Sequence, residues 1–189
     1  AIADYVLGRT PGNTVSNLSS SRGLRDVTEK HNSTYHAAAV GEVNVVTRMK
    51  EVDAVIGGEG NGGVIYPALH YGRDALVGVA LFLTLMARSG KSVSGIKASL
   101  PAYAIAKNKI QLTPDIDVDA ILEAVKEKYS GEKITDIDGV KIDFPTSWVH
   151  LRKSNTEPII RIYSEAPTMK EAEELAESIK SVINEIKTC

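Results

Sequence analysis

The first hundred residues alternate between short apolar runs of period two and stretches of helical period. Strand-like runs separated by helices are typical of a parallel sheet that helices cover. In such a sheet the ligand lies beyond the carboxyl ends of the strands, and two loops here, residues 19–21 and 57–63, follow a strand in this way. The pattern predicts helices over residues 1–7, 22–31, 42–51 and 93–99, and strands over residues 13–18, 34–40 and 53–56.

The most apolar helix of the chain is expected over residues 74–87. Leucine, valine and alanine occupy most of its faces, and Gly90 follows as a stop signal. Because a helix that is apolar on most sides is typically buried, we expect this one to be covered by the rest of the domain. Asp74 is interpreted as a first-turn residue that complements the helix dipole, in preference to a group that orients Arg73.

Beyond Pro101 the pattern becomes strand-rich, and we place a domain boundary there. Asp138-Gly139 between two apolar runs indicates a hairpin, and Thr168 with Glu171 has the spacing of a capping box. We therefore predict an α/β domain with a βαβ-type mixed or parallel sheet over residues 1–100, and a small α+β domain with an antiparallel sheet and two helices over residues 101–189. The second domain is expected to contain strands over residues 103–112, 134–137, 140–144, 147–151 and 159–163, and helices over residues 118–129 and 169–187.

The composition excludes several classes of partner. The 189 residues carry a formal net charge of −2, which favours neither nucleic acid nor an anionic membrane. No apolar run reaches the ~18 residues that a bilayer span requires. The single cysteine, Cys189, cannot form an internal disulfide, which fits a cytoplasmic location. Because the chain starts without methionine and within a helical pattern, we expect it to be part of a longer protein.

The stretch over residues 57–63 contains five glycines around Glu59 and Asn61. Glycine lets the backbone approach a ligand closely, the glutamate offers two acceptor oxygens, and the asparagine offers a donor and an acceptor. This set suits vicinal hydroxyls of a sugar ring. It has neither the dinucleotide-binding nor the Walker pattern, so nucleotide binding is rejected. A flexible glycine-rich turn with a solvated glutamate is an equally weighted alternative.

A second polar stretch, residues 152–158, lies between two strand-like runs. It offers one guanidinium, two hydroxyls and an amide, a set that suits a phosphate because arginine matches the oxyanion bidentately. A plain polar turn is the alternative on composition alone. The candidate phosphate ligands are Arg152, Ser154, Asn155 and Thr156.

Other polar residues give weaker signals. His31, His36, His70 and His150 lack the spacing of metal ligands. The aspartates around the predicted hairpin are interpreted as solvated, and the serines of residues 19–21 have no recognisable partner base, so a hydrolytic triad is unsupported.

Taken together, the two polar stretches resemble motifs of the α-D-phosphohexomutase family. G-G-E-G-N-G-G followed by Y-G-R-D resembles the sugar-binding loop of the family's third domain, usually G-E-x-S-G-H. R-K-S-N-T-E-P-I-I-R-I-Y resembles the phosphate-binding loop of its fourth domain, R-x-S-N-T-E-P. The resemblance covers nearly the whole chain, and the order of the two motifs also agrees.

The resemblance implies roles for individual residues. Glu59 corresponds to the glutamate that holds sugar hydroxyls, and Asn61 to the neighbouring serine. Arg152, Ser154, Asn155 and Thr156 correspond to the family residues that bind the phosphate that is not reacting. Gly63 replaces a histidine, and residues 40–44 lack the histidine or lysine that many members carry. The E-x-N-G-G form is most similar to phosphoglucosamine mutases of the archaeal type.

Two family motifs are absent from the sequence, the phosphoserine loop of the first domain and the D-G-D-x-D-R metal loop of the second. The resemblance therefore implies the C-terminal half of a mutase, with phosphoserine and Mg²⁺ supplied by the missing N-terminal domains of the parent. The parent would interconvert hexose 1-phosphate and 6-phosphate through a hexose bisphosphate, and the half alone would not catalyse. A stand-alone sugar-phosphate-binding module is the alternative; a nucleic-acid-binding domain is disfavoured by charge.

Overall fold

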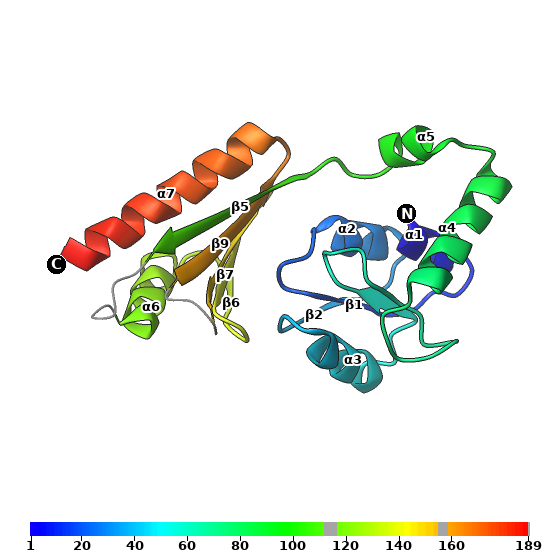
Figure 1. Ribbon diagram of the computed structural model, residues 1–189, viewed down its shortest axis with the longest axis horizontal. Coiled ribbons are helices and arrows are strands. Elements are labelled where there is room, and N and C mark those ends of the chain that lie inside the picture. Colours follow the sequence, from blue (N-terminus) through cyan, green and yellow to red (C-terminus); the bar gives the residue numbers. More distant parts are fainter. Residues whose placement is uncertain (112–116, 155–158, 189) are drawn as a thin grey trace. The chain divides into compact units, whose positions relative to one another are not determined.

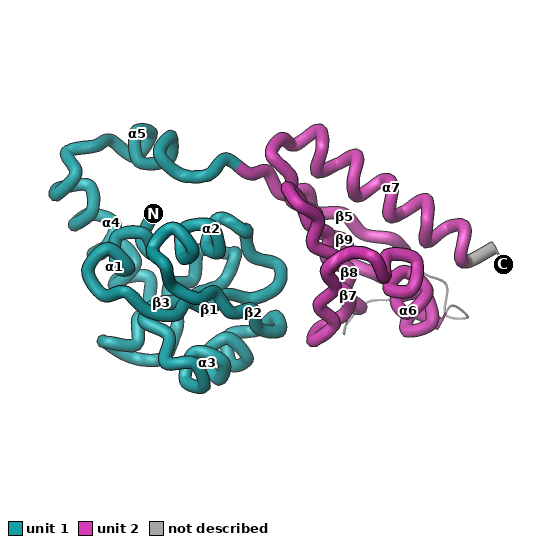
Figure 2. Tube along the Cα trace, turned by 180° about the vertical axis from the view of Figure 1, so that it is seen from behind, with its two compact units in different colours: residues 1–102 teal, residues 103–189 magenta. Residues whose placement is uncertain are grey.

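The computed structural model of the chain describes residues 1–111, 117–154 and 159–188. It contains two compact units, residues 1–102 (unit 1) and residues 103–189 (unit 2), drawn in Figures 1 and 2. Unit 1 holds a mixed sheet with helices, and unit 2 holds an antiparallel sheet with helices. The fold class predicted from the sequence is confirmed.

Unit 1 consists of short helices around one small sheet. In chain order its elements are α1 (Ile2–Leu7), β1 (Thr14–Asn17), α2 (Gly23–Lys30), β2 (Tyr35–Ala38), α3 (Glu42–Glu51), β3 (Ile56–Gly58), β4 (Val64–Ile65), α4 (Ala75–Ser89) and α5 (Val93–Ala98). The strand order is β2-β1-β3-β4, with β1 parallel to both neighbours and β4 antiparallel to β3. α1 and α2 lie on one face of the sheet and α3 on the other (Figure 1).

The third strand differs from its prediction. Residues 53–56 were expected as the strand, but β3 begins only at Ile56 and continues into the glycine-rich stretch, which ends directly before β4. Asp53 has a φ of 50, which lies outside the strand region, so the strand cannot begin there. At its other end, α3 and β1 pack closely around β3. A Cβ on Gly57 would lie 2.5 Å from the sulfur of Met49 and 2.8 Å from the carbonyl oxygen of Val15. Only glycine fits this strand position, so its low strand propensity is overridden.

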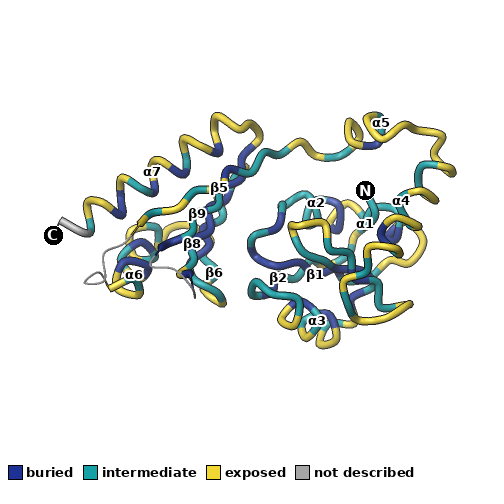
Figure 3. Tube along the Cα trace, viewed as in Figure 1, coloured by how far each residue is buried: buried dark blue, intermediate teal, exposed yellow. Residues whose placement is uncertain are grey.

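The prediction that the apolar helix is buried is wrong. α4 begins where expected, and the Asp74 carboxylate caps it by accepting a hydrogen bond from the Val77 N–H (3.0 Å), so the helix-end interpretation of Asp74 is confirmed. Leu76, however, is 82% exposed, and Val79 and Leu83 are each 56% exposed (Figure 3). The physical reason is the size of the sheet, since short strands such as the two-residue β4 cover only one side of a 15-residue helix.

Unit 2 is a five-stranded antiparallel sheet with two helices. Its elements are β5 (Ala104–Gln111), α6 (Val118–Lys128), β6 (Lys133–Thr135), β7 (Val140–Asp143), β8 (Trp148–Lys153), β9 (Ile159–Ala166) and α7 (Met169–Thr188). The strand order is β5-β9-β8-β7-β6. The capping box is confirmed, because Thr168 Oγ1 accepts from the Glu171 N–H (3.2 Å) and Glu171 Oε2 accepts from the Thr168 N–H (3.0 Å).

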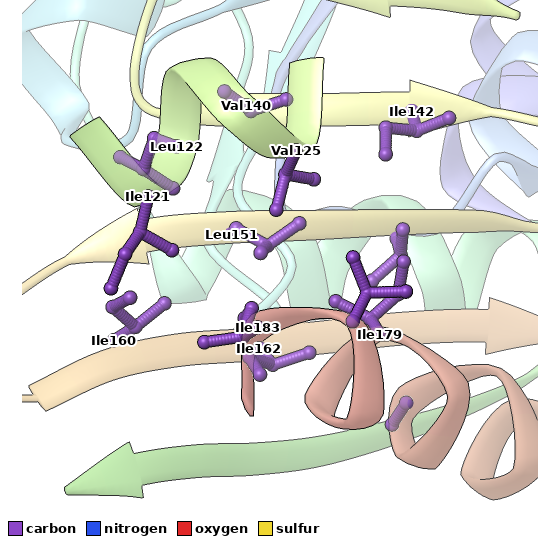
Figure 4. Packing of buried hydrophobic residues seen from close by; sticks show 13 residues of the cluster. Ile121, Leu122, Val125, Val140, Ile142, Leu151, Ile160, Ile162, Ile179 and Ile183 are labelled. Atoms are coloured by element: carbon purple, nitrogen blue, oxygen red, sulfur yellow. The ribbon is translucent and has the colours of Figure 1, made fainter. Parts of the chain in front are cut away.

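Both helices of unit 2 pack on the same face of its sheet. Their apolar stripes meet every second residue of β7, β8 and β9 in one buried cluster (Figure 4). The members labelled in Figure 4 are Ile121, Leu122, Val125, Val140, Ile142, Leu151, Ile160, Ile162, Ile179 and Ile183. Because successive side chains of a strand point to opposite faces, the alternate residues of β8 and β9 are directed to the other face. That second face carries the charged residues of the candidate phosphate site.

Candidate functional site

Glu59 lies in the β3–β4 hairpin, at the carboxyl end of β3. The hairpin is closed by hydrogen bonds from the Glu59 N–H to the Gly63 carbonyl (3.0 Å) and from the Gly62 N–H to the Glu59 carbonyl (3.1 Å). A Cβ on Gly58 would collide with the Gly63 carbonyl oxygen, so the two chains approach as closely as glycine allows. The Glu59 side chain is 7% exposed, which argues against the alternative of a solvated glutamate on a loose turn.

Two polar side chains hold the Glu59 carboxylate. Asn17 Nδ2 donates to Oε1 (3.1 Å), and the Arg73 guanidinium forms an ion pair with Oε2 (3.0 Å). Asn17 is itself oriented by Ser20, whose hydroxyl donates to its Oδ1 (2.8 Å). Each carboxylate oxygen has more than one lone pair, so both can still accept a further hydrogen bond.

Arg73 also contacts a second carboxylate, that of Glu42 at the start of α3. Glu42 Oε1 accepts from the Arg73 backbone N–H (2.9 Å), and Oε2 accepts from Arg73 Nε (2.8 Å). These two hydrogen bonds, the backbone one first, lower the pKa of Glu42 below its usual value. Glu42 in turn raises the pKa of Arg73. Arg73 therefore connects the N-terminus of α3 to the glycine-rich hairpin.

Gly63 makes room for the Arg73 side chain. A Cβ at this position would lie 2.5 Å from Arg73 Cδ and 3.0 Å from its Cγ. Any larger residue at position 63 would therefore require the Arg73 side chain to shift. Gly63, which replaces the histidine of the family motif, thus leaves the space that the Arg73 side chain occupies when it pairs with Glu59.

A cavity of about 470 Å³ lies next to the hairpin, within unit 1. Its lining includes the polar residues Glu59, Ser16 and Ser20 and the apolar residues Leu24 and Phe82. The volume is within the range of small-molecule sites. Residues 19–21 and 57–63 meet at this edge, as expected for loops at the carboxyl ends of parallel strands.

Asn61 is placed differently from Glu59. Its side chain is exposed and its Oδ1 accepts from the Gly63 N–H (3.1 Å), so it stabilises the turn of the hairpin. Its Nδ2 group is not needed for that bond. A role of Asn61 toward a sugar stays a prediction.

The residues missed by the sequence interpretation in unit 1 are Asn17, Glu42 and Arg73. Asn17 ends β1, so its position at a strand end was a usable signal. Glu42 lies 31 residues from Arg73 along the chain, and no local pattern could have paired them.

In unit 2 three cations lie in a row across the sheet. Arg161 of β9 is directly opposite Arg152 of β8 on one side and Lys109 of β5 on the other. Directly opposed residues of antiparallel strands point to the same face. We call these three residues the cation row. Like charges placed opposite one another destabilise a sheet, and an anion bound over the row would offset this repulsion.

The cation row lies where β8 and β9 enter the predicted phosphate loop. Ser154 is buried, and its N–H donates to the Ile159 carbonyl (3.1 Å) across the base of the loop. Asn155 and Thr156, the other predicted phosphate ligands, lie outside the described residues. Arg161 and Lys109 were missed from the sequence, although a charge within the apolar run I-I-R-I was a visible signal.

Arg152 is oriented by the β6–β7 hairpin. Its guanidinium contacts the Asp138 carboxylate at 3.4 Å, with 27% of the Arg152 side chain exposed. The neighbouring His150 is buried, and its Nε2–H donates to the Asp138 carbonyl (2.7 Å). Burial lowers the pKa of His150 to about 4, so it is neutral at pH 7. The imidazole beside Arg152 is thus uncharged at pH 7.

The described residues offer neither a metal cluster nor a membrane span. Within residues 1–111, 117–154 and 159–188, no group of three or more His, Cys, Asp or Glu side chains is arranged to hold a metal ion. In the same part of the chain, no helix has both the length and the apolar character of a membrane span.

Family models match both units. Residues 1–103 match "Phosphoglucomutase/phosphomannomutase, alpha/beta/alpha domain III", and residues 106–182 match "Phosphoglucomutase/phosphomannomutase, C-terminal domain". The phosphoglucosamine/phosphogalactosamine mutase of Sulfurisphaera tokodaii is 36% identical over 171 residues, which are 89% of this chain and 38% of that protein. The chain spans about two fifths of the length of the curated relatives it matches.

Solved structures show the same fold. A phosphoglucomutase/phosphomannomutase family protein from Burkholderia thailandensis matches 98% of this chain and 40% of its own, with a TM-score of 0.79 and 22% identity. The N-acetylphosphoglucosamine mutase of Aspergillus fumigatus, in complex with GlcNAc-6P and magnesium, matches 96% of this chain and 45% of its own, with a TM-score of 0.62 and 14% identity.

Proposed function

Since the chain belongs to the phosphoglucomutase/phosphomannomutase family, we propose that it is the substrate-holding part of a phosphohexose mutase. The substrates of the whole protein would be hexose 1-phosphates and 6-phosphates, with a hexose bisphosphate as intermediate. In this proposal unit 1 binds hydroxyl groups of the sugar and unit 2 binds the phosphate that is not reacting. The cation row beside the predicted phosphate loop is the observation that carries the proposal, since it adds two cations to the sequence motif.

Glu59 is proposed to accept hydrogen bonds from neighbouring sugar hydroxyls. Asn17 and Arg73 hold its two oxygens in place, so little side-chain entropy is lost when a sugar binds. The cavity beside it is lined by both polar and apolar residues, and a sugar ring, which has hydroxyl groups and C–H faces, can use both kinds of contact.

The cation row and Ser154 are proposed to hold the distal phosphate. Arginine provides fork-shaped donors that match a phosphate, and a lysine adds charge without fixed geometry. In the proposed mechanism the intermediate binds in two orientations, and the site must hold a phosphate in each of them. A site that binds mainly through charge can do so, because charge attraction requires less exact geometry than hydrogen bonding. Because His150 is neutral at pH 7, the positive charge proposed to bind the phosphate comes from the cation row and not from this imidazole.

The phosphoryl transfer itself is assigned to the domains that precede the third one in the family. In the proposed reaction a phosphoryl group moves from a phosphoserine oxygen to the free hydroxyl of the hexose phosphate, and the hydroxyl proton passes to the serine oxygen. The bisphosphate then returns its other phosphoryl group to the serine, takes up a proton on the oxygen that is freed, and leaves as the isomeric hexose phosphate. Mg²⁺, when bound in the parent, neutralises charge on the phosphoryl oxygens. The part proposed for this chain in the reaction is to bind and orient the sugar phosphate.

One experiment tests whether the chain binds but does not catalyse. The purified 189-residue chain should show no interconversion of hexose 1- and 6-phosphates, yet glucose 1,6-bisphosphate should shift the side-chain NMR signals of Arg152 and Arg161. Interconversion by a preparation free of host mutase would contradict the assignment of roles. If neither signal shifts, the proposal that Arg152 and Arg161 bind the phosphate is wrong, while the family assignment is unaffected.

A second experiment separates binding from chemistry in the full-length protein. Arg152→Ala should raise KM by roughly 10- to 150-fold, because a charge-assisted contact to a phosphate is lost, while the bound chemical step slows less. Release of the bisphosphate should increase in parallel. Arg152→Lys should restore only part of the affinity, since the charge remains and the fork is lost. Arg88→Ala, at the end of α4, is the matched control and should leave both quantities unchanged.

Glu59→Gln tests the sugar contact separately. The amide replaces one acceptor by a donor, so the ranking of glucose, mannose and glucosamine phosphates by kcat/KM should change while the response to free bisphosphate changes little. An unchanged ranking would assign sugar selection to other residues.

A further inference from the structure

The outer side of α4 carries a stripe of apolar side chains without a charge. We call it the α4 stripe; its members are Leu76, Val79, Ala80, Leu83 and Ala87. They recur at intervals of three and four residues, so they share one side of the helix. All five are exposed in the chain, and exposed positions recur along α4 in Figure 3.

The α4 stripe differs from the outer side of an ordinary surface helix. Such a helix places charged and polar residues toward water, but no charged residue occurs between Asp74 and Arg88. The inner side, with Val77, Gly78 and Leu81, is less exposed and packs against α1 and β4. Unit 1 thus uses one side of α4 and leaves an equally apolar side open.

We propose that the α4 stripe is the surface on which the preceding domain of the longer mutase packs. Unit 1 matches the third domain of the family, and the chain spans only about two fifths of its curated relatives, so those relatives contain further domains ahead of this one. α1, the first helix of unit 1, packs against α4. Although α1 lies against the inner side of α4, a domain joined ahead of α1 is tethered next to the helix that carries the stripe. The proposal rests on family membership and goes beyond the proposed substrate contacts.

The shape of the stripe indicates what the partner surface must be. From Leu76 to Ala87 it extends over roughly 16 Å, about three helical turns. Ala80 is a small residue between the larger Leu76 and Leu83, and the stripe ends at the small Ala87; small residues of this kind let the ridges of another helix approach closely. The partner surface is accordingly an apolar helix face or sheet face without charges at its centre.

The test measures binding of a defined probe to the 189-residue chain. The probe is the part of the Sulfurisphaera tokodaii relative that precedes its match to this chain, checked first for a cooperative unfolding transition of its own, and binding is followed by calorimetry and by hydrogen exchange of α4. Leu76→Glu combined with Leu83→Glu should raise Kd at least about 30-fold, as expected for central apolar contacts. Met169→Glu, at a 48% exposed position of unit 2, makes the same kind of change elsewhere and should leave Kd unchanged.

Folding and self-association are checked in the same series. Because Leu76 and Leu83 are exposed in the chain, the double variant should keep the circular dichroism spectrum of the parent chain. No binding of the probe, or equal binding by the double variant, would overturn the proposal. A dimer of the 189-residue chain that the double variant abolishes, with probe binding unaffected, would assign the stripe to a second copy instead.

Discussion

Arg73 is the residue on which the candidate sugar site depends most. Its guanidinium reaches Glu59 at 3.0 Å and Glu42 at 2.8 Å, so one cation compensates two carboxylates from different parts of the sequence. Without it, the largely buried Glu59 would face Glu42 with no intervening positive charge. A carboxylate removed from water needs such compensation to stay ionised at low cost.

We predict that Arg73→Gln lowers the thermal unfolding midpoint of the 189-residue chain by about 2–4 °C. Arg48→Gln is the matched control: Arg48 is 40% exposed and Arg73 is 42% exposed, but Arg48 pairs with the exposed Glu51. The control should change the midpoint by less, since exposed ion pairs contribute little. Equal effects, measured by differential scanning calorimetry, would show that the link to Glu59 adds nothing.

His150 gives a pH dependence that can be assigned to one residue. Its pKa falls from 6.5 to about 4 on folding, chiefly because it is buried, so the folded chain binds its proton less tightly than the unfolded chain does. The stability that this contributes is complete above about pH 6.5 and is lost as the pH falls toward 4. The loss amounts to about 3 kcal/mol over this range.

His150→Gln should therefore flatten the fall in unfolding free energy between pH 6.5 and 4, while its amide can still donate to the Asp138 carbonyl. Urea unfolding at a series of pH values measures this. His70→Gln is the control at a half-exposed position, and it should retain the steeper fall. The same slope in both variants would mean that other groups cause the acid sensitivity.

Among the elements, the β6–β7 hairpin positions Arg152. Gly139 has φ +70, and a Cβ there would collide with the Leu151 carbonyl oxygen and lie 3.1 Å from the Arg152 Cα. The hairpin thus lies in close contact with the backbone of β8 at Arg152, the member of the cation row on that strand. The two strands can pair this closely only because residue 139 has no side chain.

Gly139→Ala should destabilise unit 2 by about 2 kcal/mol or more, since alanine is strained at positive φ and also collides with β8. Gly131→Ala, where an added Cβ meets nothing within 4 Å, should change stability little. Urea unfolding gives the comparison. The chemical shift of the Arg152 side chain should change in Gly139→Ala and stay the same in Gly131→Ala. An unchanged shift in both variants would mean that the hairpin does not position Arg152.

On the scale of the whole molecule, the chain contains two compact units that join between residues 102 and 103. Residues 98, 99, 101 and 102 of this connection are exposed, and among the described residues no strand pairs with it before Ala104. A connection of this kind is where proteases cut first.

Limited proteolysis should therefore cleave within residues 98–103 first and yield two resistant fragments, which mass spectrometry identifies. Each fragment should keep a cooperative unfolding transition, because each contains its own buried cluster. First cleavage inside β8 or β9 would contradict the division into two units.

Much of the architecture is determined by local sequence patterns. The alternation in the first hundred residues, the Asp138-Gly139 turn and the Thr168–Glu171 capping box act over a few residues, and the structure contains all of them. The motif around Glu59 likewise identified the loop that borders the cavity, although the hairpin that this loop forms with Val64–Ile65 was not predicted. These features follow from backbone preferences and hydrophobic period, which do not depend on distant parts of the chain.

Tertiary structure alone decided which distant residues meet. The Glu42–Arg73–Glu59 contacts join residues up to 31 positions apart, and the cation row depends on strand register across β5, β9 and β8. The exposure of α4 could not be predicted from the sequence either, because the burial of a helix depends on how much of its surface the neighbouring elements cover. A hydrophobic pattern states which side chains favour burial, and only the packed chain shows which of them achieve it.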